Sequence, residues 1–221
     1  MTTLPADSPV ARSAGVPRVH ARDLLRIIGW AIGFRVLSAV VAFLANVAFP
    51  DYQPSPFSAG LMPNAFWDTF ARWDSGWYYQ IARNGPHYTP GGRDTIAWFP
   101  MYPLLMRGVG SLLGRRGFDI YLGGIIVSWT AFVLAAIGLY TLTRLDRSRR
   151  QAERAVLFVT VFPFSYFFGI VYSEALFLAA TVWAFYFFRT RRWLIGGLLG
   201  GIATATRVNG IMMGPALAWL V

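Results

Sequence analysis

The chain has 221 residues, of which 56% are hydrophobic and 14% are charged, and it contains no cysteine. Soluble domains usually carry roughly 25% charged residues, so this chain has too few to cover its own apolar surface. We therefore expect a polytopic membrane protein of the all-α class. The missing cysteines exclude disulfides, thiolate chemistry and zinc–thiolate sites.

The formal net charge of +10 comes from arginine alone, because the chain contains no lysine. Arginines cluster beside apolar runs, notably in 144–150 and 189–192, and the positive-inside rule explains this placement without a nucleic-acid partner. These clusters are predicted to be cytoplasmic, which leaves 50–118, 172–174 and 206–210 outside. Membrane lipid is the expected surrounding, and no nucleic acid is expected.

Residues 1–26 are predicted to be a cytoplasmic tail, and 27–221 to be a transmembrane domain. The apolar run 27–49 begins this domain, and about 23 helical residues are enough to cross a hydrocarbon core of about 30 Å. Arg35 lies inside the run. It either snorkels to the cytoplasmic headgroups or faces the bundle, where it would pair with a carboxylate or a lipid phosphate.

The predicted first extracytoplasmic loop, 50–118, is long, and loops of this length usually carry function. Within it, apolar side chains recur at three- and four-residue steps, at Phe66, Phe70, Trp73, Trp77 and Ile81. This spacing predicts one amphipathic helix, and its tryptophans favour a position at the membrane–water boundary. The tripeptide Asn-Gly-Pro at 84–86 is expected to end that helix.

Asp74 is the candidate reactive group of this loop, and two interpretations are open. As a helix N-cap, its carboxylate would accept amide protons of the following turn. As a general base, it would take a proton from an acceptor hydroxyl that attacks an activated carbon. The flanking indole rings of Trp73 and Trp77 would then desolvate the carboxylate and stack against a sugar ring.

The rest of the chain reads as further apolar segments. Arg107 and several glycines make 104–114 a poor span, so we expect a re-entrant or interfacial helix there. Further spans are predicted at 119–142, 155–171, 175–188 and 194–206, the second of them kinked at Pro163. The last run, 211–221, is too short to span, so we expect either that the chain is a fragment or that a partner completes this helix.

Two more charged residues fall on the predicted outer side. Glu174 is one of two glutamates in the chain. Three roles are open for it: it caps the helix that starts beside it, it orients a substrate hydroxyl, or it pairs with Arg207. Arg207 either anchors in outer headgroups or binds a lipid phosphate or diphosphate leaving group. The histidines His20 and His87 do not form a metal-ligand pattern, and no DxD or phosphate-cradling glycine loop occurs, so no metal or cofactor is expected.

Four segments, in order, resemble motifs of the PIG-V-type mannosyltransferases of the GT-C superfamily: RWDSGWYYQIA at 72–82, FPMYPLL at 99–105, YSEALF at 172–177 and TRVNG at 206–210. The resemblance implies a GT-C-like transmembrane helix bundle and a polyprenyl- or dolichyl-phosphate-linked mannose donor. It also implies inversion at the anomeric carbon, with a carboxylate of the first outer loop as general base. That carboxylate maps onto Asp74.

A candidate substrate-binding set accompanies Asp74. Its members are Arg72, Trp73, Trp77, Tyr78, His87, Tyr102, Ser173, Glu174, Arg207 and Asn209. The donor is expected to be a polyprenyl-phosphate-linked sugar, and the acceptor a hydroxyl of a glycolipid or glycan. Arginine-only usage suggests a bacterial plasma membrane, with the site on the extracytoplasmic face. The chain departs from the family at His87, beside an unusual insertion, and in being about half the family's length.

Two alternatives belong to other functional classes. A transporter or flippase for a lipid-linked sugar would place its ligand near the midplane between broken helices and would show internal repeats. No convincing repeat is visible in the sequence, and the polar groups gather on one predicted face. A non-catalytic subunit of a transferase complex is the second alternative.

Overall fold

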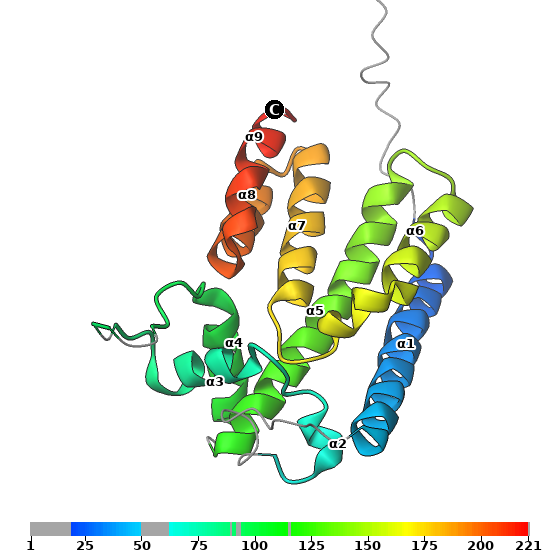
Figure 1. Ribbon diagram of the computed structural model, residues 1–221. Helices are drawn as coiled ribbons and strands as arrows, with labels where there is room; N and C mark the ends of the chain where they lie inside the picture. The colour runs from blue at the N-terminus through cyan, green and yellow to red at the C-terminus, as the bar shows by residue number, and fades with distance from the viewer. Residues whose placement is uncertain (1–18, 50–61, 89, 92–93, 115, 221) are drawn as a thin grey trace, which may run out of the picture.

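The computed structural model describes residues 19–49, 62–88, 90–91, 94–114 and 116–220, and these contain helices and no strand. Figure 1 shows the long helices α1 and α5 beside the shorter α6, α7 and α8, while α2, α3 and α4 gather around one end of α5. The predicted all-α class is thus confirmed for the described residues.

Two helices, α1 (Ala21–Ala48) and α5 (Gly117–Arg144), are long and apolar enough to cross a membrane. Each has 28 residues, which corresponds to about 42 Å at 1.5 Å per residue. Helix α1 buries every fourth residue of its first five turns: Asp23, Ile27, Ala31, Arg35 and Ala39. Its other apolar side chains are largely exposed, as expected of a helix that meets lipid on most sides.

The remaining helices of the bundle are shorter: α6 (Arg149–Val161), η1 (Pro163–Phe168), α7 (Glu174–Arg189), α8 (Trp193–Thr206), η2 (Val208–Met212) and α9 (Met213–Ala218). With 16 and 14 residues, α7 and α8 are only about 24 and 21 Å long. The start of α7 therefore lies beside the middle of α5. Ser128, eleven positions into α5, donates a hydrogen bond to the Tyr172 carbonyl (3.3 Å).

The predicted helix 64–83 is two helices, so the expectation of one continuous amphipathic face is wrong. Helix α2 (Ala65–Asp68) ends after one turn, and α3 (Ser75–Asn84) begins after a tight bend. Trp73 lies in this bend with φ +46°, in the left-handed region that side-chain-bearing residues rarely adopt. The predicted stop is confirmed, because Gly85 ends α3 with φ +82°.

Helix α4 (Met101–Leu113) confirms that a helix covers most of 104–114. Glycines bring α4 and α5 into close contact: a Cβ at Gly110 would lie 2.6 Å from the Ile120 Cα, and one at Gly123 would lie 2.6 Å from the Gly110 nitrogen. The Tyr102 hydroxyl, buried in this contact, bonds Ser128 Oγ at 2.9 Å. Helix α4 thus packs closely against the N-terminal half of α5, next to the site described below.

A cluster of ion pairs joins several helices near the C-terminal end of α5. Asp23 of α1 is buried, accepts from the Tyr140 hydroxyl (3.1 Å) and pairs with Arg149 of α6 (2.5 Å). Asp146 accepts two hydrogen bonds of 2.6 Å from Arg189, the last residue of α7. These contacts tie α1, α5, α6 and α7 together at the end predicted to be cytoplasmic.

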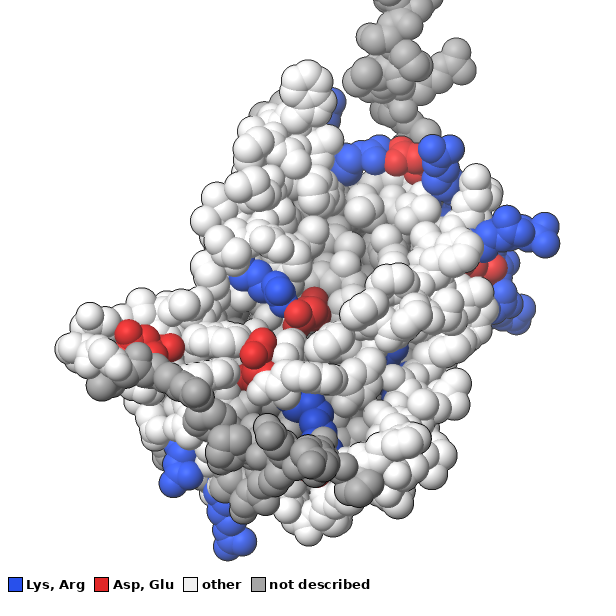
Figure 2. Space-filling model, in the orientation of Figure 1, with Lys and Arg blue, Asp and Glu red and all other residues white. Residues whose placement is uncertain are grey.

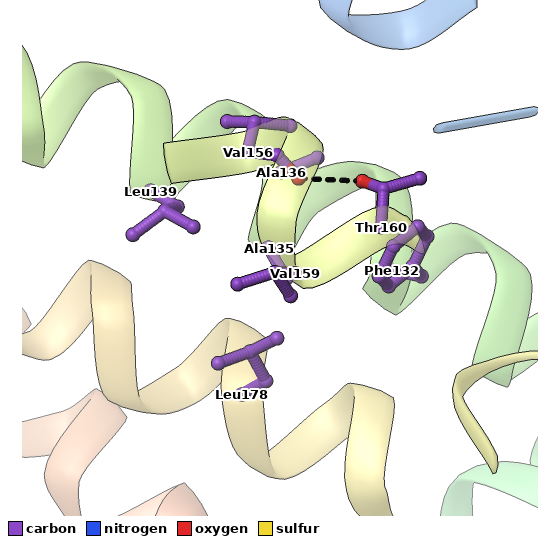
Figure 3. A pocket seen from close by; sticks show the side chains of 8 residues that line it. All are labelled: Phe132, Ala135, Ala136, Leu139, Val156, Val159, Thr160 and Leu178. Atoms are coloured by element: carbon purple, nitrogen blue, oxygen red, sulfur yellow. Dashed lines mark hydrogen bonds between the residues drawn. The ribbon is translucent and has the colours of Figure 1, made fainter. Parts of the chain in front are cut away.

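Side chains of α5, α6 and α7 pack closely where these helices meet, and the gap between them is too small for a water molecule (Figure 3). Its lining is apolar except for Thr160, whose hydroxyl donates back to the Val156 carbonyl at 2.7 Å. This contact therefore belongs to the packed core of the bundle. Phe132 and Leu178, two of its lining residues, lie one helical turn beyond Ser128 on α5 and Glu174 on α7.

The predicted span 155–171 is not one helix: α6 ends at Val161, where the expectation was only a kink. Pro163 lacks an N–H and starts the 3₁₀ helix η1, so carbonyls at the end of α6 lose their helical donors. Arg35 supplies donors instead. Its guanidinium bonds the Ser165 carbonyl, Ser165 Oγ (2.9 Å) and the Thr160 carbonyl (3.4 Å), and lies 4.5 Å from the centre of the Phe132 ring.

Arg35 is only 2% exposed, so it faces the bundle and does not snorkel. Replacing it by methionine should lower the free energy of unfolding by about 1–3 kcal/mol for each carbonyl or hydroxyl left without a donor. The loss should appear as a lower melting temperature in detergent micelles. Arg26→Met is the control on the same helix, because its bond to Glu153 is exposed and worth about 0–1 kcal/mol. Equal melting temperatures for the two variants would contradict this role of Arg35.

Candidate functional site

Three helix ends that lie far apart in the sequence meet in one polar cluster. Asp74 precedes α3, Ser173 and Glu174 begin α7, and Arg207 follows α8. Figure 2 shows acidic and basic side chains meeting near the middle of one face, at the edge of a hollow between α7 and α6. The predicted convergence of these residues is therefore present in the structure.

Glu174 and Arg207 form the ionic part of the cluster. Arg207 Nη1 bonds Glu174 Oε1 and also donates to Ser173 Oγ (3.3 Å). Of the interpretations open for Glu174, pairing with Arg207 is the one observed. The second carboxylate oxygen, Oε2, is buried and has no hydrogen-bond partner among the described residues. A carboxylate with one oxygen unsatisfied is a ready acceptor for a substrate hydroxyl or water.

Tyr78 lies at the centre of the cluster's aromatic side. Its hydroxyl bonds Ser173 Oγ (2.9 Å), and its ring packs edge-on against Trp98 and Tyr102, with centroids 5.2 and 5.0 Å away. Burial raises the pKa of Tyr78 to about 12, and the charges of Glu174, Arg207 and Asp74 also act on it. Tyr78 is thus a neutral hydroxyl at physiological pH.

Asp74 occupies the N-cap position of α3 without using its carboxylate as a cap. Its backbone carbonyl accepts from the amides of Trp77 (3.0 Å) and Tyr78 (3.2 Å). Its own N–H donates to the hydroxyl of Tyr172 (3.0 Å). The capping interpretation is therefore wrong for this structure, and the carboxylate remains available for other contacts.

The bend that carries Asp74 is held by the segment between η1 and α7. Tyr166 donates to the Thr69 carbonyl (2.6 Å), and the Val171 N–H donates to the Phe70 carbonyl (3.0 Å). Ser75 Oγ donates to the Val171 carbonyl (3.0 Å). These bonds fix the loop 69–75 against 166–172, although about a hundred residues separate them in sequence.

Trp73 in the bend and Trp77 in α3 make different contacts. Trp73 is 63% exposed, and its ring lies against Phe167 with centroids 5.3 Å apart. Trp77 stacks on Trp98, with centroids 6.2 Å apart and 17° between the planes. Trp98 was not among the candidates, although its place just before the FPMYPLL segment was a usable signal.

Several predicted site residues lie outside the cluster's direct contacts. Arg72 pairs with Asp68 (2.6 Å) and bonds Asn46 of α1. His87 is exposed, and its N–H donates to Thr95 Oγ1 (2.8 Å), which closes the loop after α3. Asn209 is exposed on η2. Tyr102 packs against the Tyr78 ring, and its hydroxyl is connected to the cluster through Ser128, which bonds the Tyr172 carbonyl.

No group of three His, Asp or Glu side chains that could hold a metal occurs within the described part of the chain. Tyr172 is the residue of this cluster that the sequence analysis missed as a candidate. It stands directly before Ser173 in the YSEALF segment.

Comparison with known proteins shows the family of the chain. The family model described as Mannosyltransferase (PIG-V) matches residues 24–218. GPI alpha-1,6-mannosyltransferase 2 of Rattus norvegicus is 30% identical over 203 residues, covering 84% of this chain and 40% of the relative. The Homo sapiens protein of that name is 29% identical over 202 residues, with the same two coverages. No solved structure matches the chain.

A third relative, GPI mannosyltransferase 2 of Drosophila pseudoobscura pseudoobscura, is 29% identical over 173 residues, which cover 68% of this chain and 37% of the relative. The fold, with its two membrane-length helices, and the family match together define the class: an all-helical membrane protein. Within that class, the chain belongs to the PIG-V mannosyltransferase family. It spans about two fifths of the length of the curated relatives it matches.

The turn that presents Arg207 depends on Gly210, whose N–H donates to the Arg207 carbonyl (2.9 Å). A Cβ at Gly210 would lie 2.4 Å from the Thr204 Cα, which is backbone and cannot rotate away. Gly210→Ala should therefore displace η2 and destabilise the protein by about 1–3 kcal/mol. The matched control is Gly214→Ala, where a Cβ meets nothing within 4 Å. Thermal unfolding of both variants checks this, and a melting temperature unchanged in Gly210→Ala would contradict it.

Proposed function

We propose that this chain carries the catalytic site of a membrane mannosyltransferase. The enzyme moves mannose from a polyprenyl- or dolichyl-phosphate-linked donor to a hydroxyl of a glycolipid or glycan acceptor, with inversion. The observation that carries the proposal is the position of Asp74. Asp74 and the Glu174–Arg207 pair all act on the same Tyr78 hydroxyl, and the Asp74 carboxylate is not used to cap α3. Membership of the PIG-V family and the names of the relatives support the choice of mannose.

Asp74 suits the role of general base better than Glu174 does. The charge of Glu174 is taken up by Arg207, whereas no ion pair engages the Asp74 carboxylate among the described residues. Asp74 accepts the proton of the acceptor hydroxyl as its oxygen attacks the anomeric carbon. The bond from that carbon to the donor phosphate breaks, and the lipid phosphate leaves with the electron pair. A single displacement of this kind inverts the configuration.

Arg207 is the proposed ligand of the donor phosphate. Its side chain is 34% exposed, and its bonds to Glu174 and Ser173 both use Nη1. The other guanidinium nitrogens make no hydrogen bond among the described residues, and arginine's forked donors suit a phosphate. Glu174 holds Arg207 in place and, through Oε2, is positioned to accept a sugar hydroxyl. Tyr78, Trp73 and Trp77 supply the aromatic surface beside it.

A lipid-linked donor is supported by the surroundings of the cluster. Apolar side chains, among them Phe132 of α5 and Leu178 of α7, lie one helical turn away from Ser128 and Glu174 (Figure 3). Ser128, level with the cluster, lies about 16 Å from the N-terminal end of α5, counted at 1.5 Å per residue. If α5 spans the bilayer, the site lies below the membrane surface, and an isoprenoid chain can lie against apolar side chains while its phosphate meets Arg207.

The proposed arrangement in the membrane follows from the same lengths. Helices α1 and α5 cross it, while α6 with η1, α7 and α8 complete the bundle. Helices α3 and α4 then lie at the outer side, with the site open to that face. The relatives compared above are eukaryotic, so they give no support to the bacterial location expected from arginine usage.

Replacing Asp74 by asparagine tests the proposal. With radiolabelled polyprenyl-phosphate-mannose in proteoliposomes, Asp74→Asn should lower turnover by about 10²- to 10⁴-fold, because the amide cannot accept the proton. The matched control is Asp68→Asn, since Asp68 lies in the same loop but is bound to Arg72. The control should keep most of its activity when both variants are expressed at equal levels.

Label is followed in donor lipid, in new product and in the opposite leaflet. Label in a new product, lost in Asp74→Asn and kept in Asp68→Asn, is the expected result. Near-normal turnover of Asp74→Asn would remove Asp74 as the base. Label that crosses leaflets without any new product would replace the transferase by a flippase.

A further inference from the structure

Tyr172 belongs to neither the predicted site nor the proposed chemistry, yet it contacts Asp74 directly. We infer that Tyr172 is the positioning residue for the Asp74 carboxylate: its phenol oxygen accepts the Asp74 N–H, and its hydroxyl proton is donated to the carboxylate of the same residue. This inference rests on the proposed function, because a base needs positioning only if Asp74 is the base.

The phenol of Tyr172 is fixed before it meets Asp74. The residue is 7% exposed, its carbonyl accepts from Ser128 Oγ (3.3 Å), and its N–H donates to the Ile170 carbonyl (2.8 Å). Its ring packs edge-on against Phe167 and Tyr78, with centroids 5.2 and 5.9 Å away. A group held from so many sides loses little entropy when it binds a second residue, which is the requirement for a positioning contact.

The hydroxyl has one proton to donate after it has accepted the Asp74 N–H (3.0 Å). The carboxylate of Asp74 lies on the same residue and accepts no bond from the amides of α3. Burial, and then contacts that include the Asp74 carboxylate, raise the pKa of Tyr172, so the phenol keeps its proton. One phenol thereby binds both the backbone N–H and the side-chain carboxylate of Asp74.

Without this contact, Asp74 has a competing position. An aspartate directly before a helix normally rotates its carboxylate onto the amides of the first turn. In that rotamer the carboxylate would be hydrogen-bonded to the amides of α3 and would point away from the Glu174–Arg207 pair. The left-handed backbone at Trp73 and the Tyr172 hydroxyl together oppose that outcome. Tyr172 therefore decides whether Asp74 acts as a base or as a helix cap.

The test compares Tyr172→Phe with Tyr166→Phe. Both variants keep the ring and lose one hydroxyl that bonds the loop 69–75, but only Tyr172 bonds Asp74. We expect Tyr172→Phe to lower kcat 10- to 100-fold with the donor KM changed less than threefold. We expect Tyr166→Phe to keep kcat within threefold of the wild type.

The pH profile gives a second readout. The groups that act around Asp74 are Tyr172, Tyr78, Glu174 and Arg207. A hydrogen-bond donor stabilises a charged carboxylate, so its removal in Tyr172→Phe should move the acid limb of the rate profile to higher pH. Replacing Tyr172 by 3-fluorotyrosine makes the phenol a stronger donor in the same shape. It should move the limb to lower pH, and it serves as the test if Tyr172→Phe does not fold.

Hydrogen exchange tests the contact independently of activity. The Asp74 amide bonds the Tyr172 hydroxyl, so Tyr172→Phe should speed exchange at Asp74, whereas Tyr166→Phe should not. Equal kcat, equal pH limbs and equal exchange in the two variants would overturn the inference. If the wild type transfers no mannose, the proposed function fails, while faster exchange in Tyr172→Phe alone would still establish the contact.

Discussion

The need to satisfy backbone polar groups within an apolar bundle governs this structure. Helices α6, α7 and α8 are much shorter than α5, and each end leaves amides or carbonyls without helical partners. Where water is scarce, such groups must find partners in the protein. Arg35 satisfies the end of α6, Trp129 donates to the Gly169 carbonyl (2.9 Å), and Ser128 donates to the Tyr172 carbonyl (3.3 Å). The polar cluster is the part of this network that keeps capacity to bind something else.

The electrostatics of the cluster separate its two carboxylates. Glu174 and Arg207 form a partly buried pair, which is nearly neutral as a unit and carries one carboxylate oxygen without a partner. Asp74 instead donates its backbone N–H to the neutral phenol of Tyr172, and no ion pair engages its carboxylate among the described residues. In surroundings of low dielectric constant, an arginine next to an acidic pair partner can still attract a phosphate, whereas a carboxylate without a cation is suited to take up a proton. This division of roles matches the two parts of the proposed reaction.

The sequence predicted the helices that depend on local pattern. The apolar runs at 27–49 and 119–142 are α1 and α5, Asn-Gly-Pro stops α3, and the turn at 172–174 separates η1 from α7. It also predicted that Asp74, Glu174 and Arg207 would share one face. That prediction needed only the topology, because residues between successive spans alternate sides of the membrane.

The features that the sequence could not reveal are tertiary. The spacing from Phe66 to Ile81 fits one helix, and nothing in it indicates the left-handed bend at Trp73. In the folded chain, the ring of Trp73 in this bend contacts Phe167. The partners of Arg35 belong to a segment 125 or more positions away. Tyr172 is one of ten tyrosines, and only the folded chain brings its hydroxyl to Asp74.

The most direct measurement is a structure of the protein in lipid with a polyprenyl-phosphate and an acceptor sugar bound. The account predicts that the phosphate binds Arg207 and that the isoprenoid chain lies against apolar side chains of α5 and α7. It also predicts an acceptor hydroxyl at hydrogen-bond distance, about 2.6–3.2 Å, from the Asp74 carboxylate. A phosphate bound away from Arg207, or an Asp74 carboxylate turned onto the amides of α3, would contradict it.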